Sequence, residues 1–237
     1  MKRITINNIP EQSYSTKESL RAVRTNIQFC GTGFKVILIT SVTPDEGKST
    51  VAFEIASSFA ELGKKVLLLD TDVRKSVLVN RHKATTQDGS KINGLTHYLS
   101  GQIGINDAFY QTNIENLCIM YAGQSVPNAT EILAGAAFSS MIKAFREHFD
   151  YVFIDTAPIT AAIDSSLIAK KCDGAIMVLV PEENNTRVIN RCVKQLTASG
   201  VKMLGVVLNK VQYKKNDYYG KYYGSYYGKY YGNDEGK

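Results

Sequence analysis

Short, continuous apolar runs alternate with segments of helical periodicity along most of the chain, and this alternation restricts the possible folds more than any other feature. Such runs are typical of strands that are buried on both faces of a sheet. The expected strands cover residues 35–41, 66–70, 117–121, 151–155, 174–180 and 203–208. The expected helices cover residues 15–29, 49–62, 136–148, 165–171 and 187–199. Because strands that alternate with helices pair in parallel through right-handed crossovers, we predict an α/β fold with a mainly parallel central sheet and helices on both faces.

Length and composition exclude several other classes of protein. Of the 237 residues, 44% are hydrophobic and 21% are charged, which excludes a disordered chain, a collagen-like fibre and a disulfide-rich miniprotein. There is no run of about 18 apolar residues that could span a membrane, and the first residues lack the apolar segment of a secretory signal. We therefore expect a cytoplasmic protein with reduced cysteines. The net charge of +6 is compatible with a nucleotide, an anionic lipid or a nucleic acid as partner.

The chain is expected to have three parts: an irregular arm over residues 1–14, a body over residues 15–211 and a tail over residues 212–237. A helix is expected to begin with Ser15 as N-cap and Glu18 closing a capping box. Within the body, the polar stretch 83–94 is expected to be a long loop.

The tail repeats the unit Tyr-Tyr-Gly-x four times and has no aliphatic residue. Such a segment cannot build a core, so we expect it to be disordered. Its tyrosines could accept phosphate, or the Tyr-Gly repeats interleaved with lysine could bind RNA or form a low-complexity assembly.

A phosphate-binding loop is predicted where the apolar strand 35–41 leads through a short loop into the next helix. The loop ends in Gly47-Lys48-Ser49, the last part of the Walker A pattern, although Val42 stands at the opening glycine of that pattern. Backbone N–H groups and the helix N-terminus would bind the phosphates of a nucleotide. Lys48 would reach the β- and γ-phosphates, and the Ser49 hydroxyl would bind Mg²⁺.

Three aspartates follow two other apolar strands directly. Asp70 and Asp72 come at the end of one strand, and Asp155 comes at the end of another. The carboxyl ends of parallel strands lie at one edge of the sheet, which is also where the predicted phosphate loop lies. Clustered carboxylates repel one another unless a cation lies among them, and Mg²⁺ bound to a triphosphate is such a cation.

These motifs resemble those of the bacterial protein-tyrosine kinases (BY-kinases), in the form that is a separate cytoplasmic chain, within the MinD/ParA-like group of P-loop ATPases. The matching segments are the Walker A motif (residues 41–50), the Walker A′ motif (67–74), the Walker B motif (151–158), a Pro-Asn-x-x-Glu segment (127–133) and a Glu-x-x-Arg-x-x-Arg helix (Glu18, Arg21 and Arg24). Ser76 and Ala129 stand where many members of the family have proline. Thr43 stands where MinD and ParA types have a signature lysine, so their behaviour on membranes or DNA is not carried over.

The resemblance implies a three-layer P-loop NTPase fold and an ATP- and Mg²⁺-dependent autokinase. The kinase would phosphorylate tyrosines of its own C-terminal cluster in trans and so regulate capsular or exopolysaccharide synthesis and export. The implied catalytic residues are Lys48, Asp70, Asp72 and Asp155. Either Asp70 or Asp72 would orient, and deprotonate, the tyrosine hydroxyl; the resemblance favours Asp70. A tyrosine hydroxyl has a pKa of about 10, so a well-placed base is useful to the reaction.

Further site residues follow from the motifs and the resemblance together. The predicted nucleotide contacts are Asp45, Glu46, Gly47, Lys48, Ser49, Thr50, Arg74 and Asn209, the last of which matches an adenine-reading position. The predicted Mg²⁺ ligands are Ser49, Asp70 and Asp155. The predicted phosphoacceptors are Tyr218, Tyr219, Tyr222, Tyr223, Tyr226, Tyr227, Tyr230 and Tyr231.

The expected partners also come from the resemblance. Glu18, Arg21 and Arg24 share one helix face and would join copies of the chain into a ring. A separate transmembrane adaptor of the polysaccharide co-polymerase type would recruit the kinase to the inner face of the cell membrane, a cognate tyrosine phosphatase would act on it, and no nucleic acid is expected. Two alternatives stay open from the sequence: a MinD/ParA-like ATPase that positions cargo without kinase activity, and an inactive scaffold that binds nucleotide and a membrane partner.

Overall fold

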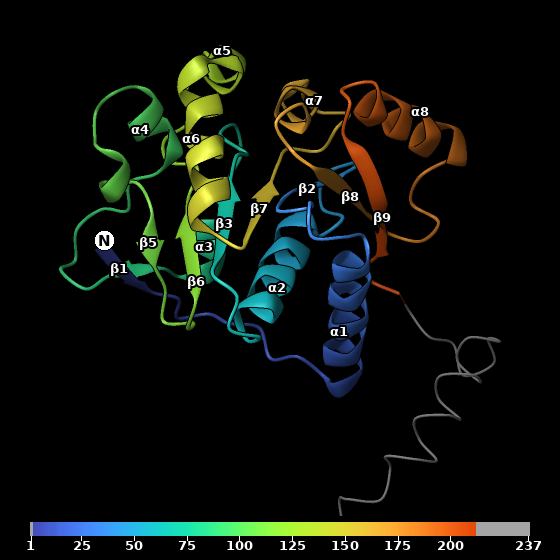
Figure 1. Ribbon diagram of the computed structural model, residues 1–237, viewed down its shortest axis with the longest axis horizontal. Helices are drawn as coiled ribbons and strands as arrows, with labels where there is room; N and C mark the ends of the chain where they lie inside the picture. The colour runs from blue at the N-terminus through green and yellow to red at the C-terminus, as the bar shows by residue number, and fades with distance from the viewer. Residues whose placement is uncertain (1, 212–237) are drawn as a thin grey trace, which may run out of the picture.

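The central sheet is built from the apolar runs of the sequence, and helices cover both of its faces (Figure 1). The computed structural model describes residues 2–211. Its strands are β1 (Lys2–Thr5), β2 (Val36–Ser41), β3 (Val66–Asp70), β4 (Thr85–Thr86), β5 (Tyr110–Gln111), β6 (Leu117–Met120), β7 (Tyr151–Asp155), β8 (Gly174–Leu179) and β9 (Lys202–Leu208). Its helices are α1 (Tyr14–Phe29), α2 (Lys48–Ala60), α3 (Leu78–His82), α4 (Leu95–Leu99), the 3₁₀ helix η1 (Ile105–Asp107), α5 (Ala129–Ala134), α6 (Ala136–His148), α7 (Asp164–Ala169) and α8 (Thr186–Thr197).

The strand order among the described residues is β4-β1-β5-β6-β3-β7-β2-β8-β9. The block from β6 to β9 is parallel throughout, whereas β5 pairs with β6 and β4 pairs with β1 in the antiparallel sense. In the parallel block, Asp70 at the end of β3 lies directly opposite Asp155 at the end of β7. The predicted α/β architecture with a mainly parallel sheet is therefore confirmed.

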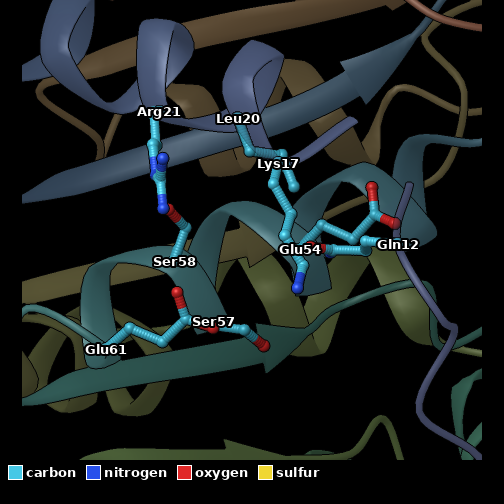
Figure 2. A pocket seen from close by; sticks show the side chains of 8 residues that line it. All are labelled: Gln12, Lys17, Leu20, Arg21, Glu54, Ser57, Ser58 and Glu61. Carbon is cyan, nitrogen blue, oxygen red and sulfur yellow. The ribbon is translucent and has the colours of Figure 1, made fainter. Parts of the chain in front are cut away.

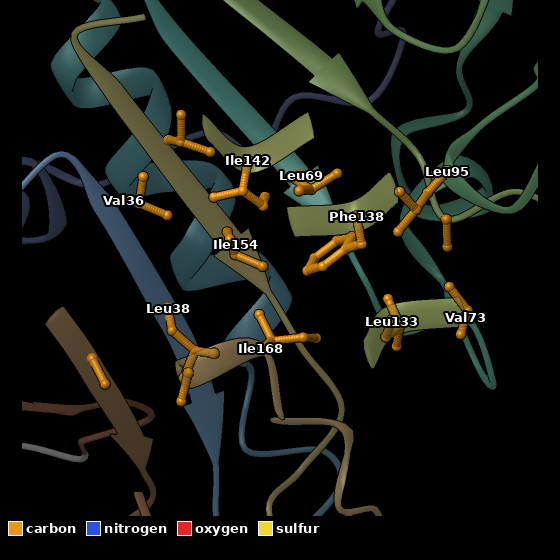
Figure 3. Close-up of a cluster of buried hydrophobic side chains, with 14 of the residues drawn as sticks. Val36, Leu38, Leu69, Val73, Leu95, Leu133, Phe138, Ile142, Ile154 and Ile168 are labelled. Carbon is orange, nitrogen blue, oxygen red and sulfur yellow. The ribbon is translucent and has the colours of Figure 1, made fainter. Parts of the chain in front are cut away.

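The central strands are buried on both faces because their side chains alternate between two apolar layers. In β2, Val36 and Leu38 point into the layer that also contains α4 to α8, while Ile37 and Ile39 point into the layer that contains α1, α2 and α3. Figure 3 shows part of the first layer, where Leu38, Ile154 and Leu69 of neighbouring strands meet helix side chains such as Ile142 and Ile168. This two-sided burial is why these strands read as continuous apolar runs rather than as alternating patterns.

The N-terminal arm is not irregular, contrary to the sequence-based expectation. Residues 2–5 form β1, which pairs in parallel with β5 and antiparallel with β4. Ile4 and Ile6 are both buried, so the alternating pattern Ile-Thr-Ile carries the signal of a strand with one face on the core. Residues 83–94 are mostly loop, as expected, except for the two-residue strand β4.

The predicted N-cap of the first helix is also wrong. Helix α1 begins at Tyr14, and the hydroxyl of Ser13 accepts a hydrogen bond from the Thr16 N–H at 3.2 Å. Glu18 does not close a capping box, because its carboxylate pairs with Arg21 instead. Several serines and threonines stand near this end, and the path of the preceding chain selects which of them caps the helix.

The short elements between β3 and α6 were not expected from the sequence beyond the strand at 117–120. They comprise α3, β4, α4, η1, β5 and α5, each of six residues or fewer. Within residues 2–211, the structure contains no helix with the length and apolarity that a bilayer-spanning segment requires. The predicted tail, with all of its predicted phosphoacceptor tyrosines, lies outside the described residues.

Candidate active site

The predicted phosphate loop connects β2 to α2 and leaves the N-terminus of α2 open. Asp45 and Gly47 both adopt positive φ, at 65° and 88°. A Cβ atom on Gly47 would lie 2.1 Å from the side-chain nitrogen of Asn209, so only glycine fits there. Gly47 is also the N-cap of α2, and no side chain caps this helix end. Unsatisfied N–H groups at a helix N-terminus form an anion-binding site, which fits a nucleotide phosphate.

Buried polar contacts hold the loop in this shape from behind. The Glu46 carboxylate is fully buried and accepts hydrogen bonds from the Thr43 N–H and the Asn184 side chain, both at 2.8 Å. The Asn209 side-chain amide donates to the Glu46 carbonyl at 2.9 Å, and the Lys210 ammonium donates to the Asp45 carbonyl at 2.6 Å. The side chains of Glu46 and Asn209 therefore support the loop backbone in this conformation, and their roles as nucleotide contacts stay predictions.

A cavity of about 170 Å³ lies in front of the loop. It is enclosed by the phosphate loop, the segment from β3 to α3 and the segment after β7. Lys48, Ser49 and Asp72 all line it. The Lys48 ammonium lies 3.2 Å from the Ser49 hydroxyl and 3.5 Å from the Asp72 carboxylate. The sheet thus brings together groups that are far apart in the sequence, as the predicted phosphotransfer site requires.

Asp70 and Asp155 form a buried carboxylate pair beside this cavity. Asp70 accepts a hydrogen bond from the Asp72 N–H at 3.0 Å and another from the Ser76 hydroxyl. Burial raises the pKa of Asp70 well above that of an ordinary aspartate, and the neighbouring charge of Asp155 raises it further. Burial also raises the pKa of Asp155, against the opposing influence of Lys48 and of a hydrogen bond with Ser49. Two carboxylates in this environment ionise together only when a cation compensates them.

One carboxylate oxygen of this pair is suited to bind a metal ion, because it has no other partner in the described part of the chain. Asp155 Oδ1 is buried and has no hydrogen-bond partner among the described residues. In residues 2–211, no three side chains of His, Cys, Asp or Glu are arranged to hold a metal ion by themselves. Mg²⁺ at nucleotide sites usually takes only one or two carboxylates together with phosphate oxygens and water. Ser49 and Asp155 therefore suit a Mg²⁺ ion that arrives with a nucleotide.

Arg74 lines the cavity, but its guanidinium group is bound to the protein. Its Nε donates to the buried carboxylate of Asp164 at 2.7 Å, and its Nη2 donates to the Thr130 hydroxyl at 2.8 Å. The Thr130 hydroxyl donates in turn to the second Asp164 oxygen at 2.8 Å. The arginine of the Walker A′ segment thereby connects α5 and α7, and its predicted contact with the nucleotide stays a prediction.

Sequence reasoning missed two residues that contact the site. Ser76 was noted only as a replacement for proline, yet its hydroxyl donates to Asp70. Arg81 was not noted at all, yet it lines the cavity and donates from Nη1 to the Thr50 hydroxyl at 2.6 Å. Neither residue belongs to a motif of the chain, so only the course of the segment after β3 could reveal them.

The three residues of the predicted interface helix have different environments. Glu18 and Arg21 form an ion pair on the surface of α1, whereas Arg24 donates to the backbone carbonyl and the hydroxyl of Ser58 on α2, at 2.7 and 2.9 Å. Figure 2 shows the small cavity between the two helices, with Arg21 on one wall and Glu54 on another. Burial raises the pKa of Glu54. Of the three residues, Arg21 is exposed, whereas Glu18 and Arg24 are half-buried.

Similarity to known proteins agrees with this geometry. A family profile described as an AAA domain matches residues 34–217. The tyrosine-protein kinase CpsD of Streptococcus pneumoniae serotype 4 is 44% identical over 202 residues, covering 85% of this chain and 87% of that protein. The chain belongs to the bacterial tyrosine-protein kinase family.

Solved structures of similar proteins have the same fold. A chimerical protein named CapA2B2 has a TM-score of 0.79 at 28% identity, over 88% of this chain and 93% of that one. The kinase domain of the Escherichia coli tyrosine kinase ETK has a TM-score of 0.76 at 27% identity, over 86% and 80% of the two chains. The septum site-determining protein MinD of Pyrococcus horikoshii, complexed with Mg-ADP, has a TM-score of 0.63 at 25% identity, over 77% and 73%. The predicted P-loop fold and kinase family are thus confirmed.

Proposed function

We propose that the chain is an ATP-dependent protein-tyrosine kinase that transfers the γ-phosphoryl group to tyrosines of its own C-terminal cluster. The observation that carries this proposal is the convergence of Lys48, Asp72 and the Asp70–Asp155 pair at the open N-terminus of α2. The 44% identity to a tyrosine-protein kinase supports the same activity. By the same similarity, the phosphorylation would regulate the synthesis and export of a capsular or extracellular polysaccharide.

The nucleotide would bind with its phosphates against the first turn of α2. Lys48 would place its positive charge beside the terminal phosphates, and Ser49 and Asp155 would hold Mg²⁺, with Asp70 behind them. Bound Mg²⁺ supplies charge neutralisation on the phosphate oxygens, which is the main requirement of phosphoryl transfer. The Mg-ADP complex of the related MinD protein supports this choice of cofactor.

The Asp70–Asp72 pair would orient the tyrosine hydroxyl. Asp72 lines the cavity, while Asp70 lies beneath it with both carboxylate oxygens in hydrogen bonds. Separate Asp70→Asn and Asp72→Asn variants distinguish them. The residue that takes the proton is the one whose substitution lowers kcat and removes the acidic limb of the pH–rate profile, while the affinity for Mg-ATP is kept.

The acceptor tyrosines would come from a neighbouring copy of the chain. The 20 residues that contain the repeats span on the order of 65 Å when extended, which is enough to reach another molecule in a ring. Arg21, exposed on α1 and paired with Glu18, would contribute to the contacts of that ring. Phosphate adds a charge of about −1.5 to −2 at each tyrosine, so phosphorylated tails would repel one another and loosen the ring.

Recruitment to the membrane would depend on a separate adaptor with a cytoplasmic activating segment. Its support is the family resemblance, together with the similarity to a protein that was solved as a chimera. A tyrosine phosphatase would reverse the reaction. The kinase itself would then be a cytoplasmic protein at the inner face of the membrane.

Incubation with Mg-ATP, followed by mass spectrometry of the C-terminal peptide, tests the activity. We expect additions of 80 Da on the wild-type tail, and none on the tail of the Lys48→Met variant. Phosphate release without tail modification under activating conditions would contradict the kinase and indicate a simple ATPase.

A mixing experiment tests transfer between chains. A Lys48→Met chain with its tail is mixed with an active chain that lacks residues 212–237. Modification of the Lys48→Met tail is the expected result. An unmodified Lys48→Met tail, under conditions in which the wild-type chain acquires phosphate on its tail, would contradict transfer in trans.

A further inference from the structure

Four cationic side chains line the cavity in front of the phosphate loop: Lys48, Arg74, Lys75 and Arg81. Two of them have a carboxylate partner, since Lys48 pairs with Asp72 and Arg74 pairs with Asp164. Among the described residues, neither Lys75 nor Arg81 forms an ion pair. The charge of Arg81 acts against the rise in the pKa of Asp155 without forming an ion pair with it. A cation that faces a cavity and has no ion-pair partner is suited to an anionic ligand.

Arg81 differs from Lys75 because the fold holds it against the phosphate loop. Its Nη1 donates to the hydroxyl of Thr50, in the first turn of α2, at 2.6 Å. A guanidinium group has five N–H donors, and this contact uses one of them. For the remaining side-chain donors of Arg81, no partner is present in residues 2–211. They stay available to a ligand at the same helix end.

The helix that carries Arg81 is firmly anchored although it is short. Leu78 and His82 of α3 are both buried. The His82 ring packs 4.4 Å from the ring of Phe53 on α2, measured between centroids, and its Nδ1 lies 3.1 Å from the Tyr121 hydroxyl. The Asn8 side chain donates to the Arg81 carbonyl at 2.8 Å. Arg81 is thus presented to the cavity by a fixed backbone.

The location of Thr50 indicates which phosphates Arg81 would meet. In a phosphate loop, the lysine reaches the β- and γ-phosphates, while the backbone at the start of the helix contacts the α- and β-phosphates. Thr50 lies two residues after Lys48, in the first turn of α2, where a bound nucleotide would be expected to place its non-reacting phosphates. We propose that Arg81 is an additional nucleotide-binding residue that contacts the α- or β-phosphate, which builds on the proposed nucleotide site and goes beyond its motif residues.

If Arg81 contacts a phosphate that does not react, Arg81→Ala changes nucleotide affinity and KM but not kcat. Because ATP and ADP share the α- and β-phosphates, Arg81→Ala weakens the binding of both nucleotides by the same factor. A charge-assisted hydrogen bond in such a site corresponds to roughly a 10- to 100-fold loss of affinity. The KM for ATP rises accordingly, while kcat at saturating ATP stays within about twofold, because a contact made equally in the ground and transition states does not accelerate the chemical step.

Calorimetric titration of the full chain with Mg-ADP and with a non-hydrolysable ATP analogue measures these affinities without any kinase activity. Lys64→Ala is the control, because it removes an exposed cation that does not line the cavity. We expect it to change the affinity for either nucleotide by less than about threefold. Arg81→Lys keeps the charge and recovers part of the affinity.

Arg81→Gln separates phosphate binding from a purely structural tie to Thr50. The glutamine amide can donate to the Thr50 hydroxyl, but it carries no charge. Loss of affinity in this variant, at an unchanged melting temperature, supports a phosphate contact, whereas full recovery of affinity would overturn it.

Two other outcomes would also test the assignment of Arg81 to the α- or β-phosphate. A fall in kcat at unchanged ADP affinity would place Arg81 on the transferring phosphoryl group and contradict the assignment. Wild-type protein that binds ADP through Arg81 but never modifies its tail would contradict the kinase and leave the Arg81 contact intact.

Discussion

Two ion pairs beside the same cavity, Lys48–Asp72 (the floor pair) and Arg74–Asp164 (the wall pair), differ in their distances and in the polar groups that lie next to them. On the floor, Lys48 and Asp72 approach only to 3.5 Å, and the neighbouring Asp155 keeps one buried oxygen without a partner among the described residues. On the wall, Arg74 and Asp164 meet at 2.7 Å, and Thr130 completes the hydrogen bonds of the carboxylate.

We interpret the Lys48–Asp72 pair and its surroundings as groups that bind and react with a ligand, and the Arg74–Asp164 pair as one that supports the fold. Buried polar groups are normally fully hydrogen-bonded, so an incomplete set within a cavity indicates a ligand that is still to bind. Asp72 and Arg74 lie only two residues apart in the chain, so the same loop contributes one residue to each kind of pair. The predictions below test this distinction, beginning with the largest expected effect.

Substitution of the floor lysine should abolish catalysis without unfolding the protein. We expect Lys48→Met to lower tail phosphorylation by roughly 10³-fold or more, because a charge that stabilises the transferring phosphoryl group is lost. Mass spectrometry of the tail measures the activity, and thermal unfolding without nucleotide serves as the control. A melting temperature lowered by many degrees would instead make Lys48 a supporting residue.

The carboxylate pair should make the Mg²⁺-free protein sensitive to pH. The pKa values of Asp70 and Asp155 are raised in the folded state, chiefly by burial, so the folded protein binds more protons than the unfolded chain. The contribution of this pair to stability is then greatest below the ordinary carboxyl pKa, near 4, and is lost as the pH rises toward neutrality through the raised values. Urea unfolding at several pH values measures the trend.

Asp70→Asn is the control variant. Because it removes one of the two ionisable carboxyl groups, its free energy of unfolding should fall less steeply as the pH rises. Saturating Mg-ADP should also flatten this fall in the wild-type protein, because the cation then compensates both carboxylates. A pH dependence from pH 5 to 8 that is the same in the wild type and in Asp70→Asn, in the absence of Mg²⁺, would contradict the raised pKa values.

The wall pair should affect stability more than chemistry. Arg74→Ala leaves the buried Asp164 carboxylate with Thr130 as its remaining side-chain partner, and we expect a loss of about 1–3 kcal/mol in the free energy of unfolding. Urea unfolding measures this loss, and Arg74→Lys should restore part of it. If Arg74→Ala is as stable as the wild type but loses kcat as Lys48→Met does, then the two ion pairs do not have different roles.

The same distinction applies to α1 and predicts the smallest effects. Arg24 is bound to Ser58, so Arg24→Ala should cost about 1 kcal/mol of stability. Arg21 is exposed, so Arg21→Ala should leave stability within about 0.5 kcal/mol and lower the mass of the oligomer. Light scattering and urea unfolding separate the two, and an unchanged oligomer mass in both variants would contradict an interface at this helix.

The local sequence pattern was sufficient to predict the parallel core of the sheet and the position of the phosphate loop. The runs at 66–70 and 151–155 were predicted with the bounds of β3 and β7, because a strand buried on both faces is apolar throughout and ends at its first charged residue. The arm was misinterpreted because β1 is short and its partners, β4 and β5, have only two residues each. Nothing within four residues reveals which distant strand they will join.

The sequence by itself determined that β2, β3 and β7 end in a phosphate loop and three aspartates, since periodicity and motif spacing are properties of neighbouring residues. Only the tertiary structure decided which side chains complete that site: Ser76 on Asp70, Arg81 on Thr50, and Asp164, 90 positions beyond Arg74, on the guanidinium of Arg74. Those contacts depend on how α3, α5 and α7 pack around the sheet edge. Hydrogen bonds between distant segments form where packing brings donor and acceptor together, and no local pattern encodes that meeting.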